Sequence, residues 1–366
     1  METVVRVEVS RNIYMSFLNM EKPRRLVPGF GPPDAKIAIV GEAPGAYEDA
    51  QLKPFVGPAG TILEQCLHAA GLIRSDVYLT NVVKVRPPKN DISNYFNGRT
   101  FSEAGMEWVQ LLREELNAHG CNVIVACGAV PMAALIGRYK ITKLRGYIFE
   151  SIELTPLRKV IPTIHPAASM YDRKGGQKGA LATSEFKPYL YRHVIASDLK
   201  KAKAESQFRE LRRPERQLVY EFGSVEEVLE WLEYYEKQPI VSVDIESPRS
   251  IGEMICIGFS SKPNLGISVP LDSRWSETDE LLIWRAIQRV LKSDSIKVFQ
   301  NGVFDTWFLL TRYGFETAGE IRDTMIAHSV MYPELPKKLE FLGSVYCGAQ
   351  EYWKGKVKFD ELKEEA

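Results

Sequence analysis

A glycine- and proline-rich stretch, residues 41–60 (GEAPGAYEDAQLKPFVGPAG), constrains the first half of this chain more than any other feature. It follows residues 36–40 (KIAIV), an apolar run typical of a buried parallel strand. It precedes residues 61–72, where apolar side chains recur at helical spacing. A strand, a loop and a helix in this order predict an α/β fold, in which ligands usually bind where a strand ends and its loop begins.

Several residues of this loop suit a binding site. Gly41 and Gly45 would let the backbone approach a ligand closely. Glu42 is placed to hold a water molecule or to stabilise a developing cation, and Phe55 could offer a flat face to a planar base. The alternative is an ordinary loop between a strand and a helix, with Phe55 packed in the core.

Three later segments also end in polar or small-residue turns. Residues 77–90 (VYLTNVVKVRPPKN) predict a strand and a basic loop, residues 123–137 a strand, a turn and a helix, and residues 160–169 (VIPTIHPAAS) another strand end. Asn81 could read a base edge, because an amide presents a donor and an acceptor side by side. The alternative for Asn81 is an asparagine that only forms the turn at the end of the strand. The alternative for His165 is a structural role, since a lone histidine is more often structural than catalytic.

In this order, these motifs resemble the uracil-DNA glycosylase superfamily, closest to its family 4 and related bacterial and phage branches. The resemblance covers roughly residues 35–200 and implies an α/β/α sandwich with a parallel sheet, which flips uracil out of DNA and hydrolyses its N-glycosidic bond. It implies that Gly41, Phe55 and Asn81 bind the uracil. It also implies that Glu42 orients the attacking water or stabilises an oxocarbenium-like sugar, and that His165 stabilises the leaving anion.

Basic residues near these motifs predict contacts to DNA phosphates. The segment 169–179 (SMYDRKGGQKG) resembles the loop that wedges into the duplex beside a flipped base, with Met170 or Tyr171 as the wedge. The formal net charge of zero divides into +6 for residues 1–200 and −6 for the rest, and a basic first half suits a DNA partner. The predicted DNA-binding residues are Lys84, Arg86, Lys89, Arg173 and Lys174.

Family 4 glycosylases carry a 4Fe–4S cluster, and the resemblance places one of its cysteine ligands at Val85. This sequence has no cysteine before Cys66, and its five cysteines form no C-x-x-C pair. Because such a cluster needs thiolate ligands, we expect no iron–sulfur cluster and no cofactor in this half. Scattered cysteines, no signal-peptide pattern and no long apolar run favour a reduced, cytosolic compartment without a membrane partner. The resemblance to bacterial and phage branches implies the cytoplasm of a bacterium or of a phage-infected host.

A change of composition at residues 206–217 predicts a linker between two domains, residues 1–205 and 218–366. Early in the second domain, residues 223–238 predict an amphipathic helix with a capping box formed by Ser224 and Glu227.

Paired carboxylates follow in residues 239–247 (PIVSVDIES), a predicted strand that places Asp244 and Glu246 on one face. Such neighbours repel each other unless a cation lies between them, which indicates a divalent metal site. The alternative is a solvated acidic surface. Residues 296–310 (IKVFQNGVFDTWFLL) predict a strand and a helix that carries Asp305.

These carboxylate motifs, DIE and NGVFD, together with the later DTMIAHSVMYPELPKKLEFLG, resemble the 3′–5′ proofreading exonuclease domain of family A DNA polymerases. The resemblance implies a ribonuclease H-like fold with a mixed sheet, and a site in which Asp244, Glu246 and Asp305 could hold Mg²⁺ or Mn²⁺. The family's fourth carboxylate, in a Tyr-x-x-x-Asp motif, has no counterpart here, and Asp323 and Asp360 are weak substitutes. We therefore expect a weak or inactive exonuclease.

The expected partners are uracil-containing DNA and a DNA polymerase domain or other replication proteins. Two alternatives stay open at this point. The chain could be the N-terminal fragment of a longer polymerase, or an accessory module that senses uracil or grips DNA without excision.

Overall fold

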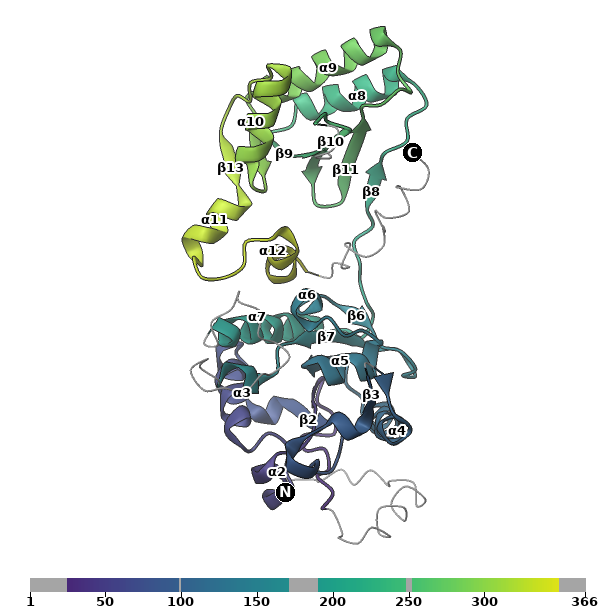
Figure 1. Ribbon diagram of the computed structural model, residues 1–366, viewed down its shortest axis with the longest axis vertical. Coiled ribbons are helices and arrows are strands. Elements are labelled where there is room, and N and C mark those ends of the chain that lie inside the picture. The colour runs from purple at the N-terminus through teal and green to yellow at the C-terminus, as the bar shows by residue number, and fades with distance from the viewer. Residues whose placement is uncertain (1–24, 99, 171–189, 248–251, 349–366) are drawn as a thin grey trace. The chain divides into compact units, whose positions relative to one another are not determined.

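The computed structural model describes residues 25–98, 100–170, 190–247 and 252–348 (Figure 1). The chain divides into two units, the first formed by Met1–Arg212 with Glu340–Ala366 and the second by Arg213–Leu339. Each unit has its own sheet. Within the described residues, we find no helix with the length and hydropathy that crossing a membrane requires.

The first unit is built on a five-stranded sheet in the order β2-β1-β5-β7-β6. Its strands are β1 (Ile37–Gly41), β2 (Val77–Asn81), β5 (Val123–Cys127), β6 (Phe149–Glu150) and β7 (Lys159–Thr163). All neighbours are parallel except β6 and β7. Every residue of the four longer strands is buried, as expected for strands covered on both faces, and this explains the uninterrupted apolar runs of β1 and β5.

Helices cover both faces of this sheet. Figure 1 shows α3 and α7 on one side and α4 and α5 on the other, so the predicted α/β/α sandwich is confirmed. The helices are α2 (Ala46–Gln51), α3 (Pro58–Ala69), α4 (Glu103–Ala118), α5 (Ala129–Ile136), α6 (Ile141–Leu144) and α7 (Leu190–Glu205). Short 3₁₀ turns span Arg74–Asp76, Pro88–Asn90, Ser93–Tyr95 and Pro166–Ser169, and a small hairpin joins β3 (Phe96–Asn97) to β4 (Thr100–Phe101).

Helix α12 (Leu339–Tyr346) also packs within the first unit. The buried Arg145 pairs with Asp198 and donates to Ser344 Oγ at 3.0 Å. Lys201 Nζ donates to the carbonyl oxygens of Ser344 and Cys347 at 2.7 and 2.9 Å. The structure thus groups residues from Glu340 with the first unit, whereas the sequence places them in the second domain, and the domain boundaries stay a prediction.

The second unit has a mixed six-stranded sheet in the order β13-β12-β9-β10-β11-β8. Its strands are β8 (Gln217–Val219), β9 (Ile240–Glu246), β10 (Cys256–Lys262), β11 (Leu265–Pro270), β12 (Ile296–Phe299) and β13 (Ile321–Asp323). Strands β9, β10 and β11 are antiparallel, and the remaining pairs are parallel. This is the mixed sheet that the resemblance implied.

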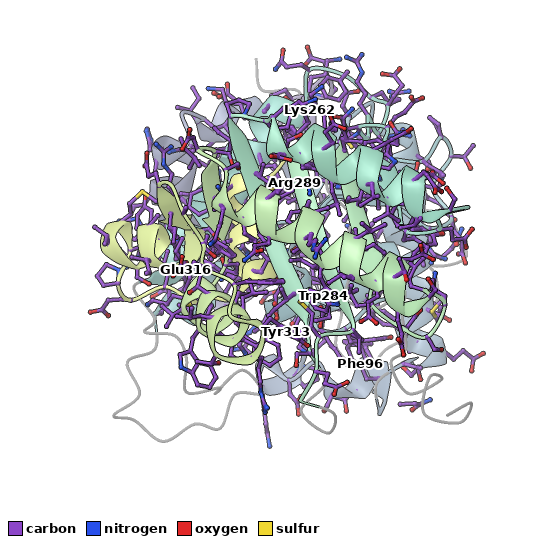
Figure 2. The ribbon with its side chains drawn as sticks, turned by 90° about the horizontal axis from the view of Figure 1, so that it is seen from above. Phe96, Lys262, Trp284, Arg289, Tyr313 and Glu316 are labelled. Carbon is purple, nitrogen blue, oxygen red and sulfur yellow. The ribbon has the colours of Figure 1, made fainter. Side chains whose placement is uncertain are left out.

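The helices of the second unit are α8 (Val225–Glu236), α9 (Glu277–Lys292), α10 (Gly302–Tyr313) and α11 (Thr324–Met331). Helix α8 begins as predicted, where Ser224 Oγ accepts a hydrogen bond from the amide of Glu227 at 3.4 Å. Alternate residues of β9 are buried, so Val241, Val243 and Ile245 join the core and Asp244 and Glu246 lie on the opposite face. On α9, Trp284 stacks on Tyr313 with ring centroids 4.6 Å apart (Figure 2).

Candidate active site

The carboxyl ends of the parallel strands bring the predicted glycosylase residues together. Gly41 ends β1 and Asn81 ends β2, and the two are partners in the sheet register. His165 lies two residues after β7, and Gly128 directly follows β5. A Cβ atom built on Gly128 would lie 3.3 Å from Cβ of His165, which places these two strand ends in contact.

Gly41 is the point where two of the predicted uracil-binding side chains meet. A Cβ atom on this residue would lie 2.7 Å from Cζ of Phe55 and closer still to Oδ1 of Asn81. Only glycine leaves room for both side chains at this strand end. The Asn81 amide has no hydrogen-bond partner among the described residues, although the residue is buried, so its donor and acceptor are free for a ligand.

Phe55 has an unusual backbone conformation, with φ of 53° in the left-handed region that aromatic residues rarely adopt. Arg74 stabilises it by donating from Nη1 to the carbonyl of Phe55 at 2.8 Å and from Nη2 to that of Pro54 at 2.5 Å. The Phe55 carbonyl also lies directly against Gly60, where no Cβ would fit. The loop therefore holds the aromatic ring in one place, at a local cost in backbone strain.

His165 faces the ring of Phe55, with centroids 6.3 Å apart and planes inclined by 26°. Its Nδ1 accepts a hydrogen bond from the amide of Ala167 at 3.2 Å, so the proton of the neutral ring lies on Nε2. Burial lowers the pKa of His165 to about 4, and the charge of Glu48 only partly opposes this. At neutral pH the ring is therefore an uncharged hydrogen-bond donor through Nε2.

Glu42 follows β1 directly and is half-buried. Burial raises the pKa of its carboxyl group, and no described residue hydrogen-bonds to it. A carboxylate in this setting can orient a water molecule at the edge of the sheet.

Glu48, for which the sequence alone suggested no role, bridges two parts of the loop that follows β1. Its Oε1 accepts a hydrogen bond from the amide of Gly57 at 2.8 Å, and Oε2 accepts one from that of Gly45 at 3.1 Å. One carboxylate thus joins the two halves of the loop that carries Phe55. The sequence signal that could have indicated this role is an acidic residue in a glycine-rich loop, where many backbone amides need an acceptor.

The predicted phosphate contact at Lys84 is wrong, because its side chain is in the core. Lys84 is 3% exposed, and its ammonium forms a close ion pair with Glu115. It also donates to Thr80 Oγ1 at 2.6 Å and to the carbonyl of Asn81 at 2.7 Å. These three acceptors use all three of its donors.

The other predicted DNA contacts stay predictions. Arg86 is partly exposed and donates from Nε to Oδ1 of Asn90 at 2.7 Å, and Lys89 is exposed. Met170, one of the two proposed wedges, is also exposed. Tyr171, Arg173 and Lys174 lie outside the described residues.

The place at which the family carries a cluster cysteine does not fit an iron–sulfur group here. Val85 is buried in an apolar cluster with Val83, Tyr95, Trp108 and Leu111. The five cysteines are free, and within the described ranges no three His, Cys, Asp or Glu side chains gather to hold a metal.

The carboxylates of the second unit are only partly brought together. Burial and the nearby charge of Asp244 raise the pKa of Asp305 to about 6, and burial raises the pKa of Asp244. Asp305 Oδ1 accepts a long hydrogen bond from the amide of Ile245 at 3.4 Å. Glu246 lies on the same face of β9 as Asp244, but the described residues include no group of three that could hold a metal ion. Among the described residues, the donors do not complete a two-metal site.

Asp323 has a structural role. Its carboxylate accepts hydrogen bonds from the amides of Gly302 and Met325, both at 2.7 Å, and of Ile326 at 3.1 Å. It thereby stabilises the starts of α10 and α11, which leaves it poorly suited to bind a metal. Asp360 lies outside the described residues.

The fold agrees with comparisons of the chain with known proteins. A model of the uracil DNA glycosylase superfamily matches residues 28–191. The type-4 uracil-DNA glycosylase of Thermotoga maritima is 34% identical over 181 residues, which cover 49% of this chain and 82% of that protein. Its counterpart from Archaeoglobus fulgidus is 39% identical over 150 residues, covering 40% and 72%. The chain therefore belongs to the uracil-DNA glycosylase superfamily, and within it resembles the type-4 enzymes.

A second family model, a 3′–5′ exonuclease of the DNA polymerase A type, matches residues 222–364. The DNA polymerase of Bacillus phage SP01 is 23% identical over 334 residues, which cover 83% of this chain and 33% of that polymerase. The chain thus combines a glycosylase-superfamily domain with an exonuclease-family domain, and it spans about a third of this phage relative.

Proposed function

We propose that the first unit excises uracil from DNA. The observation that carries this proposal is the meeting of Phe55, Asn81 and His165 at one edge of the parallel sheet. Flipping a base out of a duplex costs roughly a few kcal/mol. Stacking of the base on Phe55, worth on the order of 1–3 kcal/mol, would offset that cost. Asn81 would pair with the uracil edge through its free amide.

The proposed reaction is hydrolysis of the bond between C1′ of the sugar and the base. The electron pair of that bond leaves with the uracil, and Nε2–H of His165 donates to O2 of the developing anion, as an oxyanion hole does. Glu42 orients the water molecule that adds to C1′, or stabilises the positive charge that builds on the sugar. Because the ring of His165 is neutral, it stabilises the anion without first gaining a proton.

The test is incubation with uracil-containing single- and double-stranded oligonucleotides in EDTA, followed by alkaline cleavage. We expect strand cleavage at the uracil, because the proposed site uses no metal. Glu42→Gln and His165→Ala should form this product at least about 10²-fold more slowly than the wild type. Intact oligonucleotide at high concentrations of the wild-type protein would disprove excision.

We propose that the second unit is a weak or inactive exonuclease. Two-metal cleavage needs carboxylates that hold two cations about 4 Å apart. Asp244, Glu246 and Asp305 supply three carboxylates where the resemblance implies four. The assay is release of nucleotides from a 3′-labelled single strand in Mn²⁺, compared with Asp244→Ala. Robust degradation that disappears in the variant would show that the site is complete.

A second candidate function is uracil sensing within a replication complex, which the similarity to a phage DNA polymerase favours. In that case the first unit would bind uracil in template DNA without hydrolysis, beside a polymerase domain in the bacterial or phage-infected cytoplasm. Tight, uracil-dependent DNA binding without an alkali-labile product would support sensing over excision.

A further inference from the structure

Lys84 forms a buried polar network behind the candidate site. Its ammonium donates to Thr80 and Asn81, the last two residues of β2, and to Glu115. Because these acceptors use all three donors, none is left for water or a phosphate. An ammonium removed from water needs such a full set of acceptors. The end of β2 is therefore held at a defined distance from α4, which carries Glu115.

The other end of this network is equally constrained. Tyr78 Oη donates to Oε1 of Glu115 at 2.7 Å, and the ring of Tyr78 stacks on His119 at 4.2 Å. Gly29 lies so close to Tyr78 Oη and to Oε1 of Glu115 that a Cβ atom would overlap both. Glu115 thus has little freedom to move, and neither has the lysine that it binds.

Asn81 is held between this network and the sheet. Its carbonyl accepts from Lys84, and its backbone pairs with Gly41, whose carbonyl accepts from the amide of Val82 at 2.9 Å. The backbone that carries the side-chain amide of Asn81 is therefore held by Lys84 on one side and by the pairing with Gly41 on the other.

We propose that Lys84 is a positioning residue for Asn81: it acts through the backbone carbonyl to hold the amide where it reads the uracil edge. This inference rests on the proposed function. A displacement of about 1 Å at a reacting group can cost 10²-fold in rate. Loss of Lys84 should therefore lower the rate of excision and the preference for uracil over cytosine, with little effect on the affinity for DNA.

The experiment compares Lys84→Met with Lys159→Met in the full chain. Lys159 is a matched control, because it is equally buried and also donates to three acceptors, yet it lies at the first residue of β7, at the opposite end of the strand from the site. A second variant, Lys84→Met with Glu115→Gln, avoids leaving a buried charge unpaired if the single variant does not fold.

Single-turnover excision below the melting temperature of every variant is the first measurement. We expect Lys84→Met and the double variant to be on the order of 10- to 100-fold slower, and Lys159→Met to match the wild type. The slope of DNA affinity against salt should not change, whereas loss of a phosphate contact would lower it by about one. Rates equal to that of Lys159→Met, or a lower salt slope, would overturn the proposal.

Amide hydrogen exchange separates this inference from the proposed function. If the wild type excises nothing, the proposed function fails, but exchange in residues 77–84 still reports on the backbone of Asn81. We expect exchange there to be at least about tenfold faster in Lys84→Met than in Lys159→Met. Equal protection in the two variants would show that Lys84 does not position Asn81.

Discussion

The ring of His165 lies 6.3 Å from that of Phe55, at an interplanar angle of 26°, although 110 positions separate the two residues in the sequence. Phe55 comes from the loop after β1, and His165 from the turn after β7. Since both strands end at the same edge of the parallel sheet, an aromatic ring and a hydrogen-bond donor lie close together there. The predictions below test that arrangement and the carboxylates of the second unit.

Gly41→Ala should abolish excision. The added methyl group would overlap the Phe55 ring, 2.7 Å away at Cζ, and the Asn81 amide, so neither could keep its position. We expect a loss of at least about 10²-fold, in line with the cost of misplacing a reacting group, measured by single-turnover excision. Gly120→Ala is the control, because a Cβ atom there meets nothing within 4 Å, and it should keep wild-type activity. Full activity of Gly41→Ala would show that the base does not bind over this residue.

His165→Ala should slow excision by about 10²–10³-fold, as removal of one oxyanion-hole donor does, and leave DNA affinity unchanged. The pKa of His165 is lowered to about 4 by burial, so the ring stays neutral across pH 5.5–8 and the rate should show no inflection near pH 6.5. A pH–rate profile of both proteins checks this. An inflection near pH 6.5 that only the wild type shows would mean that the imidazolium is the active form.

Asn81→Asp should reduce the preference for uracil over cytosine by at least about tenfold, because a carboxylate replaces the donor half of the amide. The measurement is excision from matched oligonucleotides that carry uracil or cytosine at one position. Asn122→Asp is the control, since Asn122 directly precedes β5 and its amide donates to the carbonyl of Ser206, at the opposite end of that strand from the site. If Asn81→Ala excises uracil at the wild-type rate, the residue does not read the base.

Asp305→Asn should stabilise the protein in EDTA at pH 7.5 by about 1–2 kcal/mol. Burial and the charge of Asp244 raise the pKa of Asp305 to about 6, so the folded state binds this proton more tightly than the unfolded state does. The stability that this carboxyl contributes is present below its unfolded pKa and is lost as the pH rises through about 6.

Urea unfolding at pH 5 and pH 7.5 measures the effect, which should be smaller at pH 5. Glu226→Gln, at an exposed position on α8, is the control and should change stability little at either pH. An equal effect of Asp305→Asn at both pH values would contradict the raised pKa.

The purified protein should be colourless, without stoichiometric iron or labile sulfide. The family's cluster position is Val85, whose side chain lies in an apolar cluster with Tyr95 and Trp108. Val85→Cys should therefore destabilise this cluster by about 1 kcal/mol rather than gain iron, because a single thiolate cannot hold a 4Fe–4S group. Stoichiometric iron in the wild type would overturn the prediction.

The predictions for the neighbouring residues Lys84 and Val85 depend on different kinds of information. That Val85 cannot bind a metal is a prediction that needs only the chemistry of one side chain. For Lys84 the sequence predicts a phosphate contact, since a lysine in a proline-rich loop is usually exposed. Its burial depends on Glu115, 31 positions away on α4, and no local pattern reports that pairing.

The amino-acid sequence by itself determined the strands, the loops that follow them and the family, because apolar periodicity and motif spacing are local properties of the chain. It therefore identified Gly41, Phe55, Asn81 and His165 as members of one candidate site. Only the tertiary structure decided how they are held. Arg74 hydrogen-bonds to the carbonyl of Phe55, whose backbone is in the left-handed region, Glu48 bridges the loop, and Lys84 fixes the end of β2. Those contacts join segments that are distant in sequence, and whether a charge is buried depends on the partners that folding brings to it.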